Sequence, residues 1–174
     1  MAGQLIQVAT NTVTSATSAV TLTGISDDSV YVVTILGAKC DTDAQGIRAR
    51  VTTSGTPDTD SEYDLAGKEF KTSSSFGNSS AVNQDNWFLQ TIGTPTNEQY
   101  NGIHYLYNFA NSSEFSFFTI EDTVFNSVSS LSGRQGGGMH TVNEANDGIS
   151  YHMASGNIDE GVFTLYKIIW GIDE

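Results

Sequence analysis

The 174-residue chain contains one cysteine, two prolines and no apolar run of 18 residues. A single cysteine excludes an intramolecular disulfide, and Cys40 ends an apolar stretch, so we expect it to pack as a small buried residue. The missing apolar run leads us to expect no membrane-spanning segment. Residues 1–7 also lack the basic region and apolar core of a secretory signal peptide, so we expect synthesis in the cytosol.

Positive charge is scarce as well. Seven Lys and Arg residues oppose 20 Asp and Glu residues, which gives a net charge of -13. Nucleic-acid-binding proteins neutralise phosphates with clustered cations, so this composition disfavours DNA or RNA as a partner. The chain still holds nine Phe, seven Tyr and two Trp residues. These can supply a packed interior, which argues against a disordered chain.

The apolar residues predict strands throughout. They alternate with polar residues or form short runs, which clusters of Gly, Asn, Asp and Ser separate. Residues 47–51 show the alternation, with Ile47, Ala49 and Val51 on one face and two arginines on the other. We therefore predict one all-β domain over residues 1–174, an antiparallel β-sandwich of the jelly-roll-like type. The expected strands are residues 5–8, 19–22, 30–38, 47–52, 68–72, 87–89, 102–107, 115–121, 127–131, 139–142, 148–153 and 162–170.

Between the expected strands lie polar and glycine-rich stretches. Residues 53–64, 73–85 and 91–101 are predicted loops, free to contact partners at the ends of the sandwich. Residues 132–138 include three consecutive glycines, which permit positive φ or close backbone approach. We predict a tight or bulged hairpin connection there, because no Lys-Ser or Lys-Thr follows to complete a phosphate-binding loop.

One acidic segment, residues 58–69, resembles a calcium loop in its spacing. Its carboxylates fall at positions 1, 3, 5, 7 and 12 of twelve, but Tyr63 occupies the position where the sharp turn needs glycine. No helices are expected on either side, and clustered surface carboxylates are usually solvated. We therefore expect no bound metal ion and no cofactor. The candidate ligands, should a cation bind, are Asp58, Asp60, Glu62, Asp64 and Glu69.

Residue patterns of catalysis are missing. The three histidines fall in three different expected strands, and none has the spacing of a zinc motif. No G-x-S-x-G sequence marks a nucleophile elbow. We therefore expect a non-enzymatic protein. Among the aromatic residues, Trp87 and Tyr100 are candidate glycan contacts, because exposed rings can stack on sugars. Burial in the core or in an oligomer interface is the competing interpretation.

Several segments resemble uncharacterised β-sandwich virion structural proteins of cyanophage-like marine tailed bacteriophages. The C-terminal turn and strand carry the pattern S-G-N-x-x-x-G-x-F-x-L-Y-x-I, beginning at Ser155. The other matching segments are residues 5–8, 18–25, 31–33, 47–57, 112–115 and 133–137. The resemblance implies a tail or fibre component or a capsid decoration protein, made in the host bacterial cytoplasm and located in the virion, and it brings no catalytic residues.

The resemblance also implies partners. We expect a homo-oligomer, for which a trimer is one candidate state, in contact with other virion proteins. A host surface glycan is a further candidate partner. A carbohydrate-binding module is the alternative function. Ile168 and Ile169 are neighbours in the last expected strand, so they place apolar groups on both of its faces. With Trp170 they predict an apolar patch through which copies of the chain associate.

Overall fold

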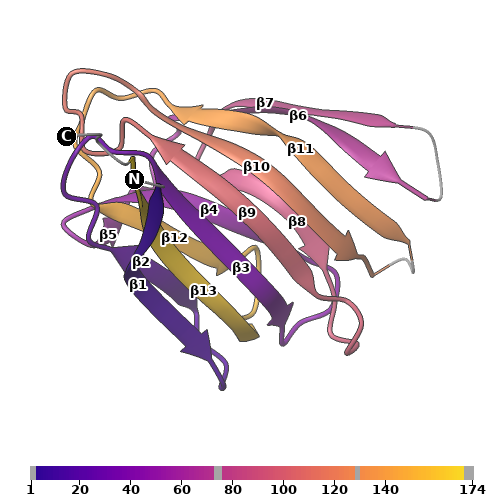
Figure 1. Ribbon diagram of the computed structural model, residues 1–174. Coiled ribbons are helices and arrows are strands. Elements are labelled where there is room, and N and C mark those ends of the chain that lie inside the picture. The colour runs from indigo at the N-terminus through magenta and orange to yellow at the C-terminus, as the bar shows by residue number, and fades with distance from the viewer. Residues whose placement is uncertain (1–2, 73–75, 128–129, 171–174) are drawn as a thin grey trace.

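The computed structural model describes residues 3–72, 76–127 and 130–170, and within these ranges every regular element is a strand (Figure 1). The described residues include no helix with the length and apolarity needed to cross a membrane. The strands are β1 (Gln4–Val13), β2 (Ala19–Thr23), β3 (Tyr31–Cys40), β4 (Gln45–Thr53), β5 (Thr56–Pro57), β6 (Tyr63–Lys71), β7 (Gly77–Gln84), β8 (Trp87–Ile92), β9 (Tyr100–Tyr107), β10 (Ser116–Phe125), β11 (Leu131–His140), β12 (Gly148–Met153) and β13 (Ile158–Ile169).

The strands form two antiparallel sheets that pack as a sandwich. The larger has the order β1-β13-β3-β9-β10-β11-β6-β7, and the smaller has the order β2-β12-β4-β5, with β8 also paired to β4. The pairs β1·β13, β2·β12, β3·β9, β4·β8 and β6·β7 are nested along the chain and alternate between the sheets. A long hairpin rolled up in this way is a jelly roll. Strands β10 and β11 widen the larger sheet between β9 and β6 (Figure 1).

The core lies between the sheets and follows the predicted alternation. Ile47, Ala49 and Val51 of β4 are fully buried, whereas the two arginines between them are only half-buried. One hydrophobic cluster draws side chains from both sheets. Cys40 belongs to it, and burial raises the pKa of its thiol, as expected for a packed cysteine rather than a nucleophile.

The glycine-rich residues 132–138 do not form the predicted hairpin connection, because they lie inside β11. None of their glycines has a positive φ. A Cβ at Gly136 would lie 2.4 Å from the Ala66 carbonyl oxygen of β6, and one at Gly138 would lie 2.6 Å from the Phe118 ring of β10. The glycines therefore allow the backbone of β11 to lie close to its neighbouring strands, which is the second property of glycine named above.

Two further expectations were wrong. Residues 127–131 were predicted as a strand, yet of the described residues only Leu131 belongs to one. Residues 127 and 130 lie in the connection between β10 and β11, and residues 128–129 lie outside the described part of the chain. Residues 73–85 were predicted as a loop, yet Gly77–Gln84 form β7 at the edge of the larger sheet. Its small polar side chains carry little β-propensity, so backbone pairing with β6 decides its conformation.

Fully buried polar side chains link the two sheets across the core. The Nε2 atom of His104 lies 2.8 Å from the Tyr100 hydroxyl, and its Nδ1 atom lies 2.8 Å from the hydroxyl of Tyr151 in the smaller sheet. The Tyr100 hydroxyl donates in turn to Asp122 at 3.3 Å. Neutral His104 satisfies this chain by donating through Nε2 and accepting at Nδ1. Burial lowers the pKa of His104 to about 3 and raises that of Asp122 to about 6.

The depressed pKa of His104 predicts acid sensitivity. The pKa of His104 is near 6.5 in the unfolded chain and about 3 in the folded chain. Its contribution to the free energy of unfolding is therefore fully present above pH 6.5 and is lost as the pH falls toward 3. Relative to His104→Gln, the native chain should lose about 2 kcal/mol more of its free energy of unfolding between pH 7 and pH 5. Urea denaturation at both pH values measures this. Contributions from other groups cancel in the comparison, so equal losses in both proteins would contradict the prediction.

The glycine run predicts a second effect on stability. A Cβ at position 138 would also lie 2.7 Å from Trp87 Nε1 and from the Asp64 carbonyl oxygen. Gly138→Ala should therefore lower the free energy of unfolding by about 1–3 kcal/mol through overpacking. Gly77→Ala is the matched control, since its Cβ would meet Glu69 at 3.4 Å, an ordinary contact. Equal stability of the two variants in urea denaturation would refute the close-approach explanation.

Candidate functional site

The predicted glycan contacts are wrong, because Trp87 and Tyr100 are both 0% exposed. The Trp87 ring stacks on Phe118 with centroids 4.1 Å apart and meets Tyr63 edge-on at 5.0 Å. Its Nε1–H donates to the carbonyl oxygens of Asp64 and Met139. A sugar cannot reach either ring, so Trp87 and Tyr100 are core residues, as the competing interpretation had it.

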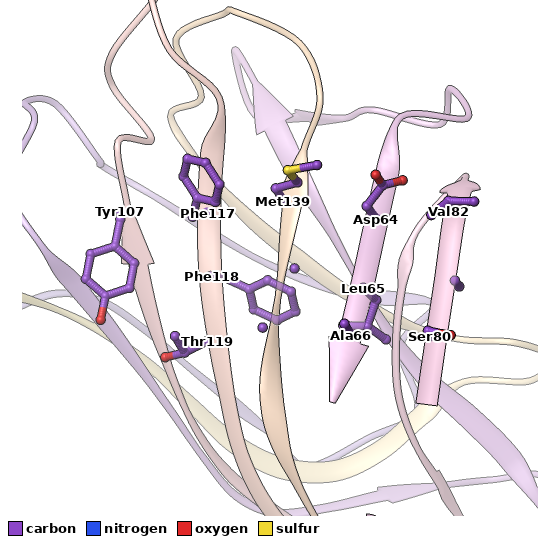
Figure 2. Close-up of a pocket in the computed structure, with 13 residues that line it drawn as sticks. Asp64, Leu65, Ala66, Ser80, Val82, Tyr107, Phe117, Phe118, Thr119 and Met139 are labelled. Carbon is purple, nitrogen blue, oxygen red and sulfur yellow. The ribbon is translucent and has the colours of Figure 1, made fainter. Parts of the chain in front are cut away.

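Exposed aromatic and aliphatic residues lie instead on the outer face of the larger sheet. Five neighbouring strands place Tyr107, Phe117, Met139, Asp64 and Val82 in one row (Figure 2). This row borders an apolar hollow of about 560 Å³. Phe117 is 40% exposed and Val82 is 63% exposed, although the solvent face of an antiparallel sheet is usually polar.

Small residues form the floor of this hollow. The next row along the ladder is Thr119, Gly137, Ala66 and Ser80, on β10, β11, β6 and β7. None of these side chains is long enough to fill the space beside the larger residues of the first row. The glycine run therefore shapes the surface as well as the interior of the sheet.

The apolar character continues along the same face. The ladder register places further exposed side chains on this side of the sheet, and Phe76 contacts Phe70 with ring centroids 5.3 Å apart. We call the whole set the outer apolar face. Its members are Phe70, Phe76, Val82, Ile103, Tyr105, Tyr107, Phe117, Phe125, Leu131 and Met139. The row of Glu121, Gln135 and Lys68 crosses this face and divides its apolar residues into two groups. Exposed apolar surface of this extent usually marks a contact with another molecule.

The predicted C-terminal interface residues form a second, smaller apolar group, which lies on both faces of the sheet edge because Ile168 and Ile169 point to opposite sides. Ile168 and Ile169 are half-buried at the end of β13, and Trp170 is 69% exposed. Edge strand β1 pairs there and adds Leu5, opposite Ile168, and Ile6, which are 59% and 48% exposed. These five residues make up the terminal patch.

The acidic segment does not gather its five predicted ligands. Asp60 is exposed, and Asp64 accepts a hydrogen bond from the Asn83 amide at 2.8 Å. Glu69 lies near the far end of β6, where it pairs with Arg134. Because Tyr63–Lys71 is an extended strand rather than a loop, its carboxylates spread along the sheet and point to different faces.

Glu69 has a structural partner of its own. The Arg134 guanidinium is 1% exposed, lies 2.7 Å from Glu69 and donates to the Phe88 carbonyl oxygen at 2.7 Å. It also lies over the Phe88 ring, 5.0 Å from the centroid. Although burial raises it, the hydrogen bonds from Lys71 and Arg134 hold the pKa of Glu69 below its ordinary value.

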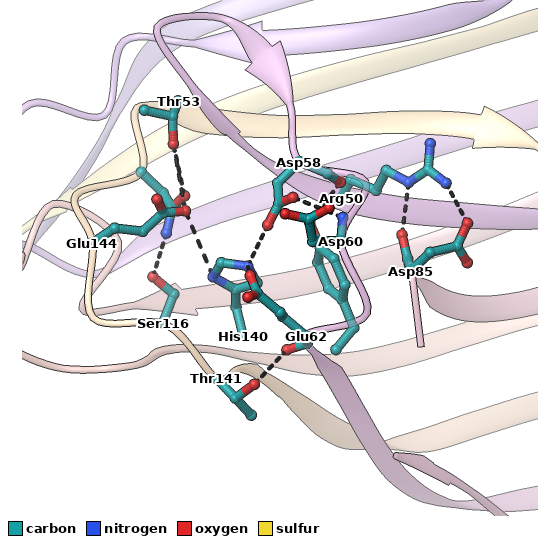
Figure 3. A network of polar contacts seen from close by, with 12 residues as sticks. Arg50, Thr53, Asp58, Asp60, Glu62, Asp85, Ser116, His140, Thr141 and Glu144 are labelled. Carbon is teal, nitrogen blue, oxygen red and sulfur yellow. Dashed lines mark hydrogen bonds and ion pairs between the residues drawn. The ribbon is translucent and has the colours of Figure 1, made fainter. Parts of the chain in front are cut away.

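The remaining carboxylates, Asp58 and Glu62, converge on His140. The Nε2 atom of His140 lies 2.7 Å from Asp58 Oδ2 and 3.5 Å from Glu62 Oε2, and Nδ1 lies 3.8 Å from Glu144 Oε1 (Figure 3). The imidazole is fully buried, whereas the three carboxylate side chains are 18–35% exposed. We call these four residues the His140 cluster.

Backbone contacts hold the cluster in place. The Tyr63 hydroxyl donates to the Asp58 carbonyl oxygen, and the Thr141 amide and hydroxyl donate to that of Glu62. Although burial opposes it, hydrogen bonds from the Asp60 amide and the His140 ring keep the pKa of Asp58 below its ordinary value. Burial and the charge of Asp58 raise the pKa of Glu62.

Sequence reasoning missed His140 and Glu144 as members of a site. His140 is 82 residues from Asp58, and no local sequence pattern links the two. The register of β11 against β6 places His140 opposite Tyr63 and so beside the acidic segment. One imidazole nitrogen and two carboxylates in this arrangement are a set that can coordinate a divalent cation.

Comparison of the chain with protein-family models, with curated proteins and with solved structures finds no match in any of the three.

The Glu69–Arg134 pair generates a prediction that separates a structural carboxylate from a metal ligand. Glu69→Gln should lower the free energy of unfolding by about 3 kcal/mol, because it leaves the buried guanidinium without its counter-charge. Asp60→Asn, at an exposed carboxylate of the same segment, should change it by less than about 0.5 kcal/mol. Denaturant titration measures both. Equal effects of the two substitutions would show that Arg134 does not depend on Glu69.

Proposed function

We propose that the chain is a non-enzymatic structural subunit of a tailed-bacteriophage particle, and that copies of it associate through the outer apolar face. The observation that carries the proposal is the number of exposed apolar side chains on the outer face of the larger sheet, in two groups on either side of one charged row. The jelly-roll topology also supports it, because viral capsid domains often use this architecture. The resemblance of the sequence to phage virion proteins supports the assignment to a phage.

The distribution of charge favours a second copy of the chain as the occupant of this face. A net charge of -13 repels copies over most of the surface. One row of the outer face is polar and charged. In it, Glu121, Gln135 and Lys68 lie opposite one another on β10, β11 and β6. In a two-fold contact, Lys68 of one copy can face Glu121 of the other, while the apolar rows pack together.

The terminal patch provides a separate surface for other virion proteins. It lies at β1 and the end of β13, at the opposite edge of the larger sheet from β7. Edge strands expose unpaired backbone groups that another chain can use. We therefore assign self-association to the outer apolar face, and attachment to a tail, fibre or capsid neighbour to the terminal patch.

Carbohydrate binding is the second candidate function, and one observation favours it. The hollow presents the rings of Tyr107 and Phe117 in the same row as the Asp64 carboxylate, with Met139 between Phe117 and Asp64 (Figure 2). Exposed rings stack on sugars, and a carboxylate accepts hydrogen bonds from their hydroxyls. Binding to a glycan array that is lost in Phe117→Ser would support a host-glycan receptor at this hollow.

Light scattering tests self-association. The native chain should be an oligomer at moderate salt, and Phe117→Ser should weaken association at least thirtyfold, which is about 2 kcal/mol for a central aromatic contact. Leu36→Ser is the matched control, because Leu36 is 66% exposed on the same sheet but lies outside the outer apolar face. Trp170→Ala should also leave self-association unchanged.

A strict monomer at high concentration would overturn the assembly proposal, and dissociation by Trp170→Ala alone would move the self-contact to the terminal patch. The phage assignment has its own test, immunogold labelling of intact particles with antibodies against the chain. Labelling of the head would favour a decoration protein, and labelling of the tail would favour a fibre or tail component. Unlabelled particles, together with absence of the chain from purified virions, would contradict a role in the particle.

A further inference from the structure

We propose that Asp58, Glu62 and His140 bind one divalent transition-metal ion, and that Glu144 holds the His140 ring in the orientation that binding requires. This site shares only Asp58 and Glu62 with the calcium loop that the sequence suggested. It does not depend on the proposed role in a phage particle.

The spacing of the three ligand atoms suits a small cation. The Asp58 and Glu62 oxygens and a His140 nitrogen all lie within 4.8 Å of one another. Ligands about 2.1 Å from a tetrahedral zinc ion lie about 3.4 Å apart. The 3.5 Å between Nε2 and Glu62 already matches this separation, and the 2.7 Å between Nε2 and Asp58 needs to open by less than 1 Å.

The second nitrogen of the ring supplies an independent observation. His140 Nδ1 is buried and has no hydrogen-bond partner among the described residues, although Glu144 Oε1 lies 3.8 Å away. When Nε2 donates to Asp58, a neutral ring leaves a bare Nδ1 lone pair facing a carboxylate. When Nε2 binds a metal, the proton moves to Nδ1 and can be donated to Glu144, which is the usual carboxylate–histidine–metal arrangement. Metal binding at Nε2 would therefore give Nδ1 and Glu144 a hydrogen bond that they otherwise lack.

The charges around the cluster also favour a cation. Three carboxylates surround the single buried imidazole, and the exposed Asp60 lies in the same turn. The nearby Arg50 guanidinium is held by Asp85, which accepts from it at 2.7 Å through its side chain and at 2.8 Å through its carbonyl oxygen (Figure 3). A divalent ion would supply positive charge between the carboxylates.

The donor set indicates which class of cation binds. Calcium collects six to eight oxygen ligands, whereas this cluster offers two carboxylates and an imidazole nitrogen. Zinc and its neighbours in the first transition row readily accept nitrogen and oxygen together. The partly exposed carboxylates leave access for the ion and for a water molecule as a further ligand.

Calorimetric titration of chelator-stripped protein with Zn²⁺ alone tests the site. We expect one equivalent to bind and to raise the melting temperature, because a ligand that binds only the folded chain stabilises it. Ca²⁺ should bind at least tenfold more weakly. Absence of zinc binding, or Ca²⁺ binding as tight as Zn²⁺ binding, would overturn the proposal.

Substitutions then locate the ion. Glu62→Gln and His140→Asn should each weaken zinc binding at least tenfold, and Glu144→Gln should weaken it about ten- to a hundredfold, as expected of a carboxylate that orients a ligating histidine. Glu62→Gln and Glu144→Gln change partly exposed side chains, so the test remains decisive if His140→Asn does not fold. The matched controls are His152→Asn and Glu114→Gln, at an exposed carboxylate outside the cluster, which should bind zinc as the native chain does.

The proton on Nδ1 distinguishes a positioning role of Glu144 from a general charge effect. Nitrogen NMR of the His140 ring should show protonated Nδ1 and metal-bound Nε2 after zinc addition. Unchanged zinc affinity in all three cluster variants would place the ion elsewhere on the acidic surface. A ring that binds zinc through Nδ1 would contradict the role given to Glu144.

Discussion

A Cβ on Gly136 would stand 2.4 Å from a carbonyl oxygen of β6, and one on Gly138 would stand 2.6 Å from a ring of β10. The arrangement of β11 between these two strands therefore depends on the absence of side chains there. On the inner side, the space that a Cβ at Gly138 would take is used by the stacked rings of Phe118 and Trp87. On the outer side, Gly137 lies in the floor of the apolar hollow. The same strand ends at His140, so its register against β6 also determines the metal-ligand cluster.

The polar groups of the core limit how the two sheets can be assembled. His104 reaches a tyrosine in each sheet, and Asp122 accepts from the Arg134 backbone amide at 2.8 Å and from the Gln90 side chain at 3.1 Å. A slip of one residue in the ladder would turn these side chains to the wrong face and leave buried polar groups without partners. The hydrophobic cluster alone would not impose this register, because apolar contacts are not directional.

The two candidate surfaces suit different kinds of partner. The outer apolar face is broad and carries both apolar groups and one charged row, which fits contact with another protein surface. The His140 cluster joins the segment before β6 to the end of β11, so an ion bound there would cross-link two parts of the chain that are distant in sequence. A metal cross-link would offer the stabilisation that a chain with one cysteine cannot obtain from an intramolecular disulfide.

The sequence by itself determined the all-β class, the sandwich and most strand positions, because alternation and turn residues are local properties of the chain. It also identified Cys40 as a core residue. Only the tertiary structure decided that Trp87 and Tyr100 are buried, that Glu69 pairs with Arg134, and that the glycine run is a strand. Each of these depends on which strands become neighbours. His140 meets Asp58 across 82 residues of chain for the same reason: strand pairing joins distant segments, and a periodic pattern shows which face a residue occupies but not what lies opposite it.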